Sequence, residues 1–184
     1  MSNKIREEIG MDKRVAILLD DLVEDVEFIY PYYRFLEENW KVDVFAVKIG
    51  EFNGKKGGKF LSNKILKYED FPNYDILYIP GGYAPDRLRR HKIILDFVRY
   101  MYENGKIVSA ICHAPWVLIS AGIVKNKRIT GFFAIKDDII NAGAIYTGNP
   151  VEIDENIITG TDPEAMPNMI KKVIEIAKGK NGYT

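Results

Sequence analysis

A cysteine followed directly by a histidine, Cys112-His113, is the pair of residues in this sequence best suited to nucleophilic chemistry. The pair follows an apolar run over 106–111 that predicts a buried strand, and it precedes a short helix expected over 114–121. A thiol at the start of a helix is expected to have a lowered pKa. A lone cysteine is more often inert packing, but a strand, a reactive side chain and an immediate helix form the nucleophile-elbow pattern. We therefore predict that Cys112 is a nucleophile.

His113 and a pair of glycines supply other groups that a thiolate reaction needs. If the ring of His113 reaches the thiol, it serves as a general base or as the imidazolium partner of the thiolate, although adjacency in sequence does not establish that contact. Gly81 and Gly82 follow a strand expected over 74–79. Their backbone N–H groups, together with that of His113, are candidates for an oxyanion site. The glycine pair alone is equally compatible with an ordinary tight turn.

Glu24 follows the first expected strand and has two interpretations. It is either a solvated carboxylate at a helix start, which the helix dipole favours, or an acid packed against Cys112. In the second case either the thiol pKa rises, or Glu24 stays protonated and donates a hydrogen bond to the thiolate. The two groups would then titrate as a coupled pair.

The elements that position these residues alternate between strands and helices, which predicts an α/β sandwich with a largely parallel sheet. Residues 1–13 are expected to form a loose leader and residues 14–184 a single domain. Asp25 is expected to cap the first helix, and Pro31 is acceptable in that helix only near its first turn. Gly122 is expected to end the helix over 114–121, and Asp162 to cap the last helix with Pro163 at its first position. Ligands of such sheets bind at the carboxyl ends of strands, so the segments 20–24, 81–82 and 112–113 should converge. Strands are expected over 15–19, 41–49, 74–79, 106–111, 129–133, 144–147 and 157–159, a hairpin around 54–58, and helices over 25–39, 86–104, 114–121 and 162–177.

Composition argues against several classes of function. The 26 basic and 26 acidic residues balance, whereas a nucleic-acid-binding protein needs a basic excess or patch. No apolar stretch approaches the ~20 residues that cross a bilayer, and the polar start lacks a signal-peptide core, so we expect a cytoplasmic protein. One cysteine forms no internal disulfide, and two histidines give no cluster with metal-ligand spacing. No phosphate-binding loop is present, and we expect neither a metal nor a cofactor.

Four longer motifs occur in order along the chain: Glu24-Asp-Val-Glu-Phe-Ile-Tyr-Pro-Tyr-Tyr-Arg34, Ile79-Pro-Gly-Gly-Tyr-Ala-Pro-Asp86, Ala110-Ile-Cys-His-Ala-Pro115 and Gly160-Thr-Asp-Pro-Glu-Ala-Met-Pro167. Together they closely resemble the PfpI family of intracellular cysteine proteases, within the DJ superfamily, over Arg14 to about Ala177. The resemblance implies a flavodoxin-like three-layer sandwich similar to class I glutamine amidotransferases. It implies that Cys112 is the nucleophile, His113 its partner and Glu24 the acid that touches the cysteine. In the family a glutamate from a neighbouring subunit completes the triad, and this sequence has Asp86 at that position.

The same resemblance implies a homo-oligomer, a dimer that can assemble into a hexamer, with surfaces near residues 28–35 and 86–101 as interface candidates. It also leaves three functions open. The first is a peptidase that acts on peptides or unfolded protein through thiolate attack on a carbonyl. The second is a glyoxalase or deglycase that acts on methylglyoxal or its adducts. The third is a non-catalytic redox stress sensor or chaperone, in which Cys112 is oxidised to a sulfinic acid and His113 has no role.

Overall fold

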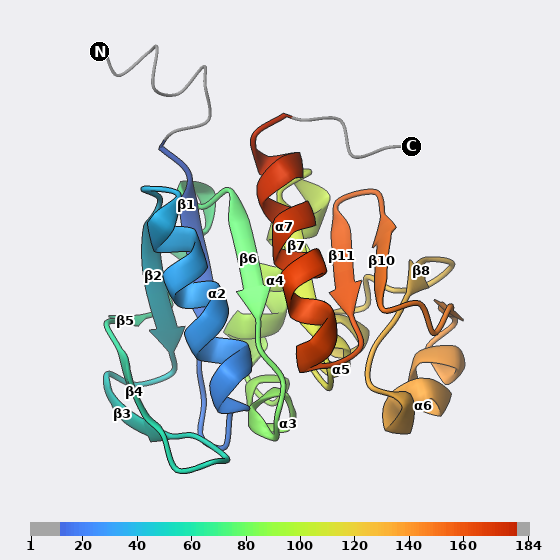
Figure 1. Cartoon of the computed structure of the whole chain (residues 1–184), viewed down its shortest axis with the longest axis horizontal. Coiled ribbons are helices and arrows are strands. Elements are labelled where there is room, and N and C mark those ends of the chain that lie inside the picture. The colour runs from blue at the N-terminus through green and yellow to red at the C-terminus, as the bar shows by residue number, and fades with distance from the viewer. Residues whose placement is uncertain (1–11, 180–184) are drawn as a thin grey trace.

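A seven-stranded sheet lies between two layers of helices in the computed structural model, which describes residues 12–179 (Figure 1). The strand order is β10-β11-β7-β6-β1-β2-β5, and every neighbouring pair is parallel except β10 and β11. The predicted α/β sandwich with a mostly parallel sheet is therefore confirmed. The strands are β1 (Arg14–Leu18), β2 (Lys41–Ala46), β5 (Lys64–Ile65), β6 (Ile76–Ile79), β7 (Ile107–Ile111), β10 (Val151–Asp154) and β11 (Ile157–Gly160).

The helices cover both faces of the sheet, as Figure 1 shows, with α2 and α7 together on the face toward the viewer. Alternate residues of β1 pack into the two layers: Val15 and Ile17 belong to the core beneath α2 and α7, whereas Ala16 and Leu18 belong to the core beneath α4 and α5. A strand buried on both faces is uniformly apolar, which explains its sequence. The helices are α2 (Asp25–Glu37), α3 (Ala84–Leu88), α4 (Lys92–Glu103), α5 (Pro115–Ala121), α6 (Lys136–Asn141) and α7 (Met166–Ala177), with 3-10 turns η1 (Tyr68–Asn73), η2 (Phe133–Ile135) and η3 (Pro163–Ala165).

Two small two-stranded sheets flank the main one. The hairpin of β3 (Gly50–Asn53) and β4 (Lys59–Ser62) is antiparallel, whereas β8 (Arg128–Ile129) and β9 (Ile145–Tyr146) are parallel. The tip of the hairpin reaches the carboxyl end of β1, because Val23 pairs with both Gly54 and Gly82. The predicted convergence of strand ends is thus confirmed for the segments around β1 and β6.

Several boundaries differ from the predictions. The helix expected over 86–104 is divided into α3 and α4, and the strand expected over 129–133 has only two residues, at 128–129. Asp25 was expected to cap α2, but Glu24 holds the cap position. Asp25 instead accepts hydrogen bonds from the backbone N–H groups of Lys56 and Gly58, which fastens the hairpin tip to the start of α2.

Pro31 is the clearest departure from expectation. It lies in the middle of the 13-residue helix α2 and is buried, whereas a position near the first turn was expected. A proline inside a helix removes one backbone hydrogen bond and pushes against the carbonyl four residues earlier, which here belongs to Glu27. The penalty is offset by a hydrogen bond from Tyr78 to that carbonyl.

Other local predictions hold. Gly122 ends α5 in the left-handed conformation, with φ 76°. The side chain of Asp162 accepts hydrogen bonds from the N–H groups of Glu164 and Ala165, as expected of a cap before Pro163. The expected leader lies outside the described residues, apart from positions 12 and 13. Within residues 12–179, no helix has both the length and the apolar character that a membrane crossing requires.

Candidate active site

Cys112 lies on a sharp turn between β7 and α5, with a left-handed backbone conformation at φ 60°. That conformation costs a residue with a side chain about 1 kcal/mol or more, so the surrounding structure must hold it. Two backbone hydrogen bonds do so: the N–H of Cys112 donates to the carbonyl of Gly160 at 3.0 Å, and the N–H of Phe132 donates to the carbonyl of Cys112 at 2.8 Å. The predicted elbow is therefore confirmed as a backbone geometry.

The turn brings the ring of His113 back to the thiol. Its Nδ1 atom lies 3.2 Å from the sulfur of Cys112, which resolves the question that sequence adjacency left open. The ring stacks on Phe132 with centroids 5.1 Å apart and meets Trp116 edge-on at 5.2 Å. Burial, assisted by the charge of Lys55, lowers the pKa of His113, so the imidazole is neutral near pH 7 and able to accept a proton.

Glu27 is the acid that contacts the thiol. It projects from the first turn of α2, is fully buried, and accepts a 2.7 Å hydrogen bond at Oε2 from the backbone N–H of Gly81. Its carboxyl also interacts with Cys112, and Oε1 has no nitrogen or oxygen partner within residues 12–179. Burial raises the pKa of Glu27 to about 7, with the negative charge of Glu24 as a further cause. A carboxyl with that pKa is partly protonated at neutral pH.

Glu24, the acid expected at this position, lies elsewhere. Its Oε2 atom forms a 3.3 Å ion pair with the ammonium of Lys55, on the hairpin that reaches the same strand end. The reason is the phase of the helix: Glu24 holds the cap position, whereas Glu27 shares the buried face of α2 with Pro31 and Phe35. The assignment of Glu24 as the acid that touches Cys112 is therefore corrected to Glu27.

The thiol itself differs from expectation in one respect. A lowered pKa was predicted, but burial, and secondarily the charge of Glu27, raises the pKa of Cys112 to about 12. The helix that follows is short and begins three residues later, at Pro115, so its dipole has little effect on the sulfur. The backbone N–H groups of Gly82 and His113 oppose the rise by facing the sulfur. A stable thiolate at this site consequently requires a proton on Glu27.

The two glycines have different roles. The N–H of Gly82 faces the thiol, as does that of His113, in keeping with the predicted oxyanion donors. The N–H of Gly81 is already bonded to Glu27 and is not free for an oxyanion, so that candidate is corrected. Gly81 also has no room for a side chain, since a Cβ atom there would lie 2.5 Å from Oε2 of Glu27 and 2.8 Å from Cβ of Cys112.

Asp86 is not part of this cluster within the described chain. It lies on α3, about half exposed, and pairs with Arg90 one helical turn later. Within residues 12–179, His113 forms no hydrogen bond to a carboxylate; its side chain contacts the thiol and two aromatic rings. The expectation that Asp86 acts across a subunit interface remains a prediction.

Sequence reasoning missed four residues around the thiol: Glu27, Lys55, Trp116 and Phe132. Glu27 had a detectable signal, because it is an acid on the apolar stripe of an amphipathic helix. Phe132 follows the short strand β8 in a segment expected to be extended, and no local pattern links it to His113. Such contacts depend on tertiary placement alone.

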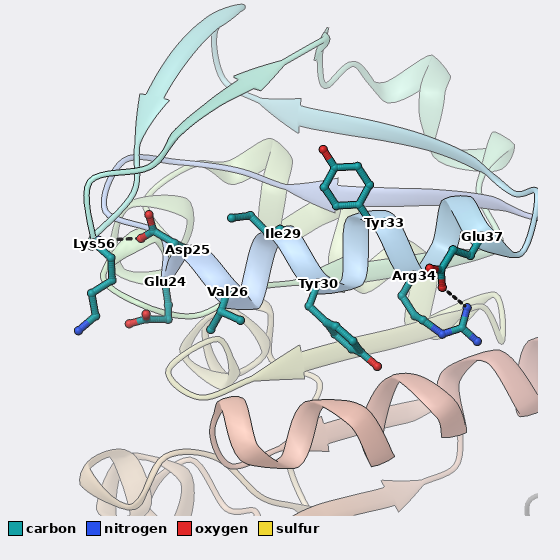
Figure 2. A pocket seen from close by; sticks show the side chains of 9 residues that line it. All are labelled: Glu24, Asp25, Val26, Ile29, Tyr30, Tyr33, Arg34, Glu37 and Lys56. Carbon is teal, nitrogen blue, oxygen red and sulfur yellow. Dashed lines mark hydrogen bonds and ion pairs between the residues drawn. The ribbon is translucent and has the colours of Figure 1, made fainter.

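A hollow runs along the outer side of α2, next to the site but separate from it (Figure 2). Its volume is about 550 Å³, and its lining does not include Cys112 or His113. In Figure 2 Ile29 and Tyr33 point to one side of the helix, Val26 and Tyr30 point to the other, and Glu24 lies at the amino end of α2. Within residues 12–179, no group of three His, Cys, Asp or Glu side chains is placed to hold a metal ion.

Comparison with known proteins agrees with this geometry. The model of the DJ-1/PfpI family matches residues 13–176. A deglycase of Pyrococcus abyssi is 38% identical over 90% of this chain and 99% of its own, and YraA of Bacillus subtilis, named as a putative cysteine protease, is 36% identical over 91% and 100%. The crystal structure of DJ-1beta from Drosophila melanogaster has a TM-score of 0.85 at 25% identity and covers 92% of each chain. The chain belongs to the DJ-1/PfpI family, whose members include proteins named as deglycases and as cysteine proteases.

Proposed function

We propose that this protein is a cysteine-dependent enzyme that converts methylglyoxal and its early adducts to a hydroxy acid. One observation carries the proposal: a thiol with His113 at 3.2 Å on one side and the buried acid Glu27 on the other. The deglycase name of the relative from Pyrococcus abyssi supports the same reading. Access favours a small substrate, since only 9% of the surface of Cys112 is exposed in the single chain.

Activation of the thiol depends on where two protons lie. Glu27 and Cys112 are coupled acids, and the reactive state has the proton on the carboxyl and the negative charge on the sulfur. The protonated carboxyl donates to the thiolate, and the N–H groups of Gly82 and His113 face the same atom. In this state the thiolate of Cys112 lies beside the neutral imidazole of His113.

The reaction of a 2-oxoaldehyde then needs no external oxidant. The thiolate adds to the aldehyde carbon, and the resulting oxyanion takes a proton, which gives a hemithioacetal. His113 removes the proton from the former aldehyde carbon and delivers a proton to the adjacent ketone carbon, while the hydroxyl proton of the hemithioacetal moves to the ketone oxygen. The first carbon is thereby oxidised to a thioester carbonyl, and the second is reduced to an alcohol. Water hydrolyses the thioester to the hydroxy acid and restores Cys112.

A peptidase is the second candidate, and the elbow itself favours it. Backbone N–H groups at Gly82 and His113 beside a nucleophile are the donors that a tetrahedral acyl intermediate uses. Peptide hydrolysis uses the same thiolate and imidazole, but the scissile bond must reach a sulfur that is largely covered. Substrates would therefore be peptides or unfolded chains.

We also propose that the protein works as a homo-oligomer in the cytoplasm. His113 has no carboxylate partner within the described chain, and Asp86 is exposed on α3, where a second copy can approach it. A group that orients the base is the usual third member of such a site. A reducing compartment suits a protein with one cysteine that must remain a thiol.

The test gives the purified protein methylglyoxal and, separately, a labelled unfolded protein, with products followed by mass spectrometry. Cys112→Ala should abolish turnover, and His113→Gln should reduce it strongly. His91→Gln is the matched control, because His91 is the other histidine of the chain and lies at the start of α4. Lactate formation that depends on Cys112 and His113 supports the proposal, and cleavage of the polypeptide without lactate replaces it by the peptidase. Failure of both reactions, with oxidation of Cys112 unaffected by His113→Gln, favours the redox sensor instead.

A further inference from the structure

Both the backbone and the side chain of Glu27 are hydrogen-bonded to the segment formed by β6 and the residues that follow it. Its carboxyl accepts from the backbone N–H of Gly81, and its backbone carbonyl accepts a 2.7 Å hydrogen bond from the hydroxyl of Tyr78. The two donors lie three residues apart, at the end of β6 and just beyond it. A residue held at its main chain and at its side-chain tip by one segment has little freedom to change its distance from Cys112.

Pro31 makes the carbonyl of Glu27 available for this bond. In an uninterrupted helix the N–H of residue 31 donates to the carbonyl of residue 27. Proline has no N–H, and its ring crowds that carbonyl. The carbonyl is buried among apolar side chains, where an unpaired acceptor costs roughly 1–3 kcal/mol. The hydroxyl of Tyr78 supplies the missing donor from the neighbouring strand.

Tyr78 lies where its hydroxyl can donate to the carbonyl of Glu27 and where solvent does not reach it. Its side chain is fully buried and packs edge-on against Phe35 of α2, with ring centroids 6.1 Å apart. The phenol stays protonated, because burial raises its pKa well above the usual value. It is therefore a permanent hydrogen-bond donor with a fixed ring.

We propose that Tyr78 is a positioning residue of the active site: through the carbonyl that Pro31 leaves free, it holds the carboxyl of Glu27 against Cys112. The inference rests on the proposed function, in which Glu27 donates to the thiolate. Tyr78 does not contact the reacting atoms and acts on the thiol through Glu27. Its loss should weaken thiolate formation while leaving the nucleophile, the imidazole and the oxyanion donors in the chain.

The experiment measures the alkylation rate of Cys112 by iodoacetamide between pH 5 and 9. The chain has one cysteine, so the signal is unambiguous, and the measurement needs no enzyme turnover. Within residues 12–179, the charged or titratable groups that act on that thiol or on its acid are Glu24 and Glu27 at the start of α2, Lys55 from the hairpin, Tyr78 from β6 and His113. The substitution at Tyr78 leaves the other four in place.

Tyr78→Phe should shift the acid side of the profile to higher pH and slow alkylation at pH 6.5 by roughly three- to tenfold, the effect of one lost hydrogen bond. The double variant Pro31→Ala with Tyr78→Phe should restore the rate, because an alanine at position 31 has the backbone N–H that donates to the carbonyl of Glu27. Tyr74→Phe is the matched control: Tyr74 is an equally buried tyrosine that donates to Asp43 at 2.6 Å, away from the thiol.

Three results would overturn the inference. They are a profile for Tyr78→Phe that matches the unaltered protein or becomes faster, an equal loss in Tyr74→Phe, and no recovery in the double variant. Urea unfolding of each variant separates a shift in the thiol profile from general loss of structure. Absence of methylglyoxal turnover together with the predicted alkylation profile would reject the proposed function and leave the positioning role intact.

Discussion

The backbone N–H of Gly81 donates a 2.7 Å hydrogen bond to Oε2 of Glu27, and there is no space between that glycine and Cys112. A methyl group at Gly81 would lie 2.5 Å from Oε2 of Glu27 and 2.8 Å from Cβ of Cys112. We expect Gly81→Ala to displace the acid from the thiol and to lower turnover by roughly 100-fold, as displacements of about 1 Å do in active sites.

Gly160→Ala is the control for that prediction. Its Cβ would meet the sulfur of Met169 at 2.7 Å, and a flexible methionine side chain can move aside. Gly160 holds Cys112 through its backbone carbonyl, which an alanine retains, so we expect a loss of less than about tenfold. Similar losses in the two variants at equal folded fraction would show that the Glu27 contact is unimportant.

The raised pKa of Glu27 makes stability depend on pH in a definite direction. Below pH 4.5 the folded and unfolded states both hold the proton, and between 4.5 and about 7 the folded state holds more of it. Raising the pH through that window therefore favours unfolding, by at most ~3 kcal/mol. Glu27→Gln lacks this proton and should gain stability relative to the unaltered protein as the pH rises from 4.5 to 8. Urea unfolding at several pH values measures the difference, and a constant difference would contradict the assignment.

The left-handed backbone at Cys112 leads to an unusual prediction for glycine. Glycine normally destabilises a strand end relative to alanine, but at φ 60° it avoids the clash that a Cβ atom causes. Cys112→Gly should therefore be more stable than Cys112→Ala by about 1 kcal/mol, and both should be inactive. The same pair of substitutions at Ser109, three residues earlier in β7, should show the opposite order. An alanine variant at position 112 that is as stable as the glycine variant would argue against a strained elbow.

A complementation experiment tests whether Asp86 acts between subunits. Asp86→Ala and Cys112→Ala should each be inactive or nearly so when assembled alone. If each site combines Cys112 of one copy with Asp86 of another, random mixing into dimers should restore about a quarter of the full activity. Absence of recovery, with mixed oligomers verified by mass, would place Asp86 outside the site. Light scattering on the unaltered protein establishes the oligomeric state.

Much of the fold was predictable because the relevant patterns are local. Apolar runs such as 15–19 and 106–111 mark strands buried on both faces, and Gly122 and Asp162 mark helix ends by backbone chemistry. The elbow at Cys112 followed from the order of strand, thiol and helix. These signals need no knowledge of distant contacts.

The acid of the site was misplaced because two glutamates lie three residues apart and only the start of α2 decides between them. Glu27 is inside α2 and on its buried face, whereas Glu24 is at the cap position, has an extended backbone and pairs with Lys55. The buried proline was unexpected for a related reason: its tolerance depends on a hydroxyl from Tyr78, which is distant in sequence. The sequence also carries no pattern that predicts stacking of Phe132 on His113.

The site is built from residues at the ends of strands that are far apart in the sequence, and the last of these strands, β11, is near the carboxyl end of the chain. Glu27, Gly81 and Cys112 come from three separate segments, and the N–H of Cys112 closes onto Gly160 near the end of the sheet. A nascent chain that stops before β11 thus carries the thiol without the bond that fixes its elbow. Since the protein has a single cysteine, the rate at which Cys112 is alkylated reports whether folding is complete. The progress of synthesis or refolding can be followed by that rate without any introduced label.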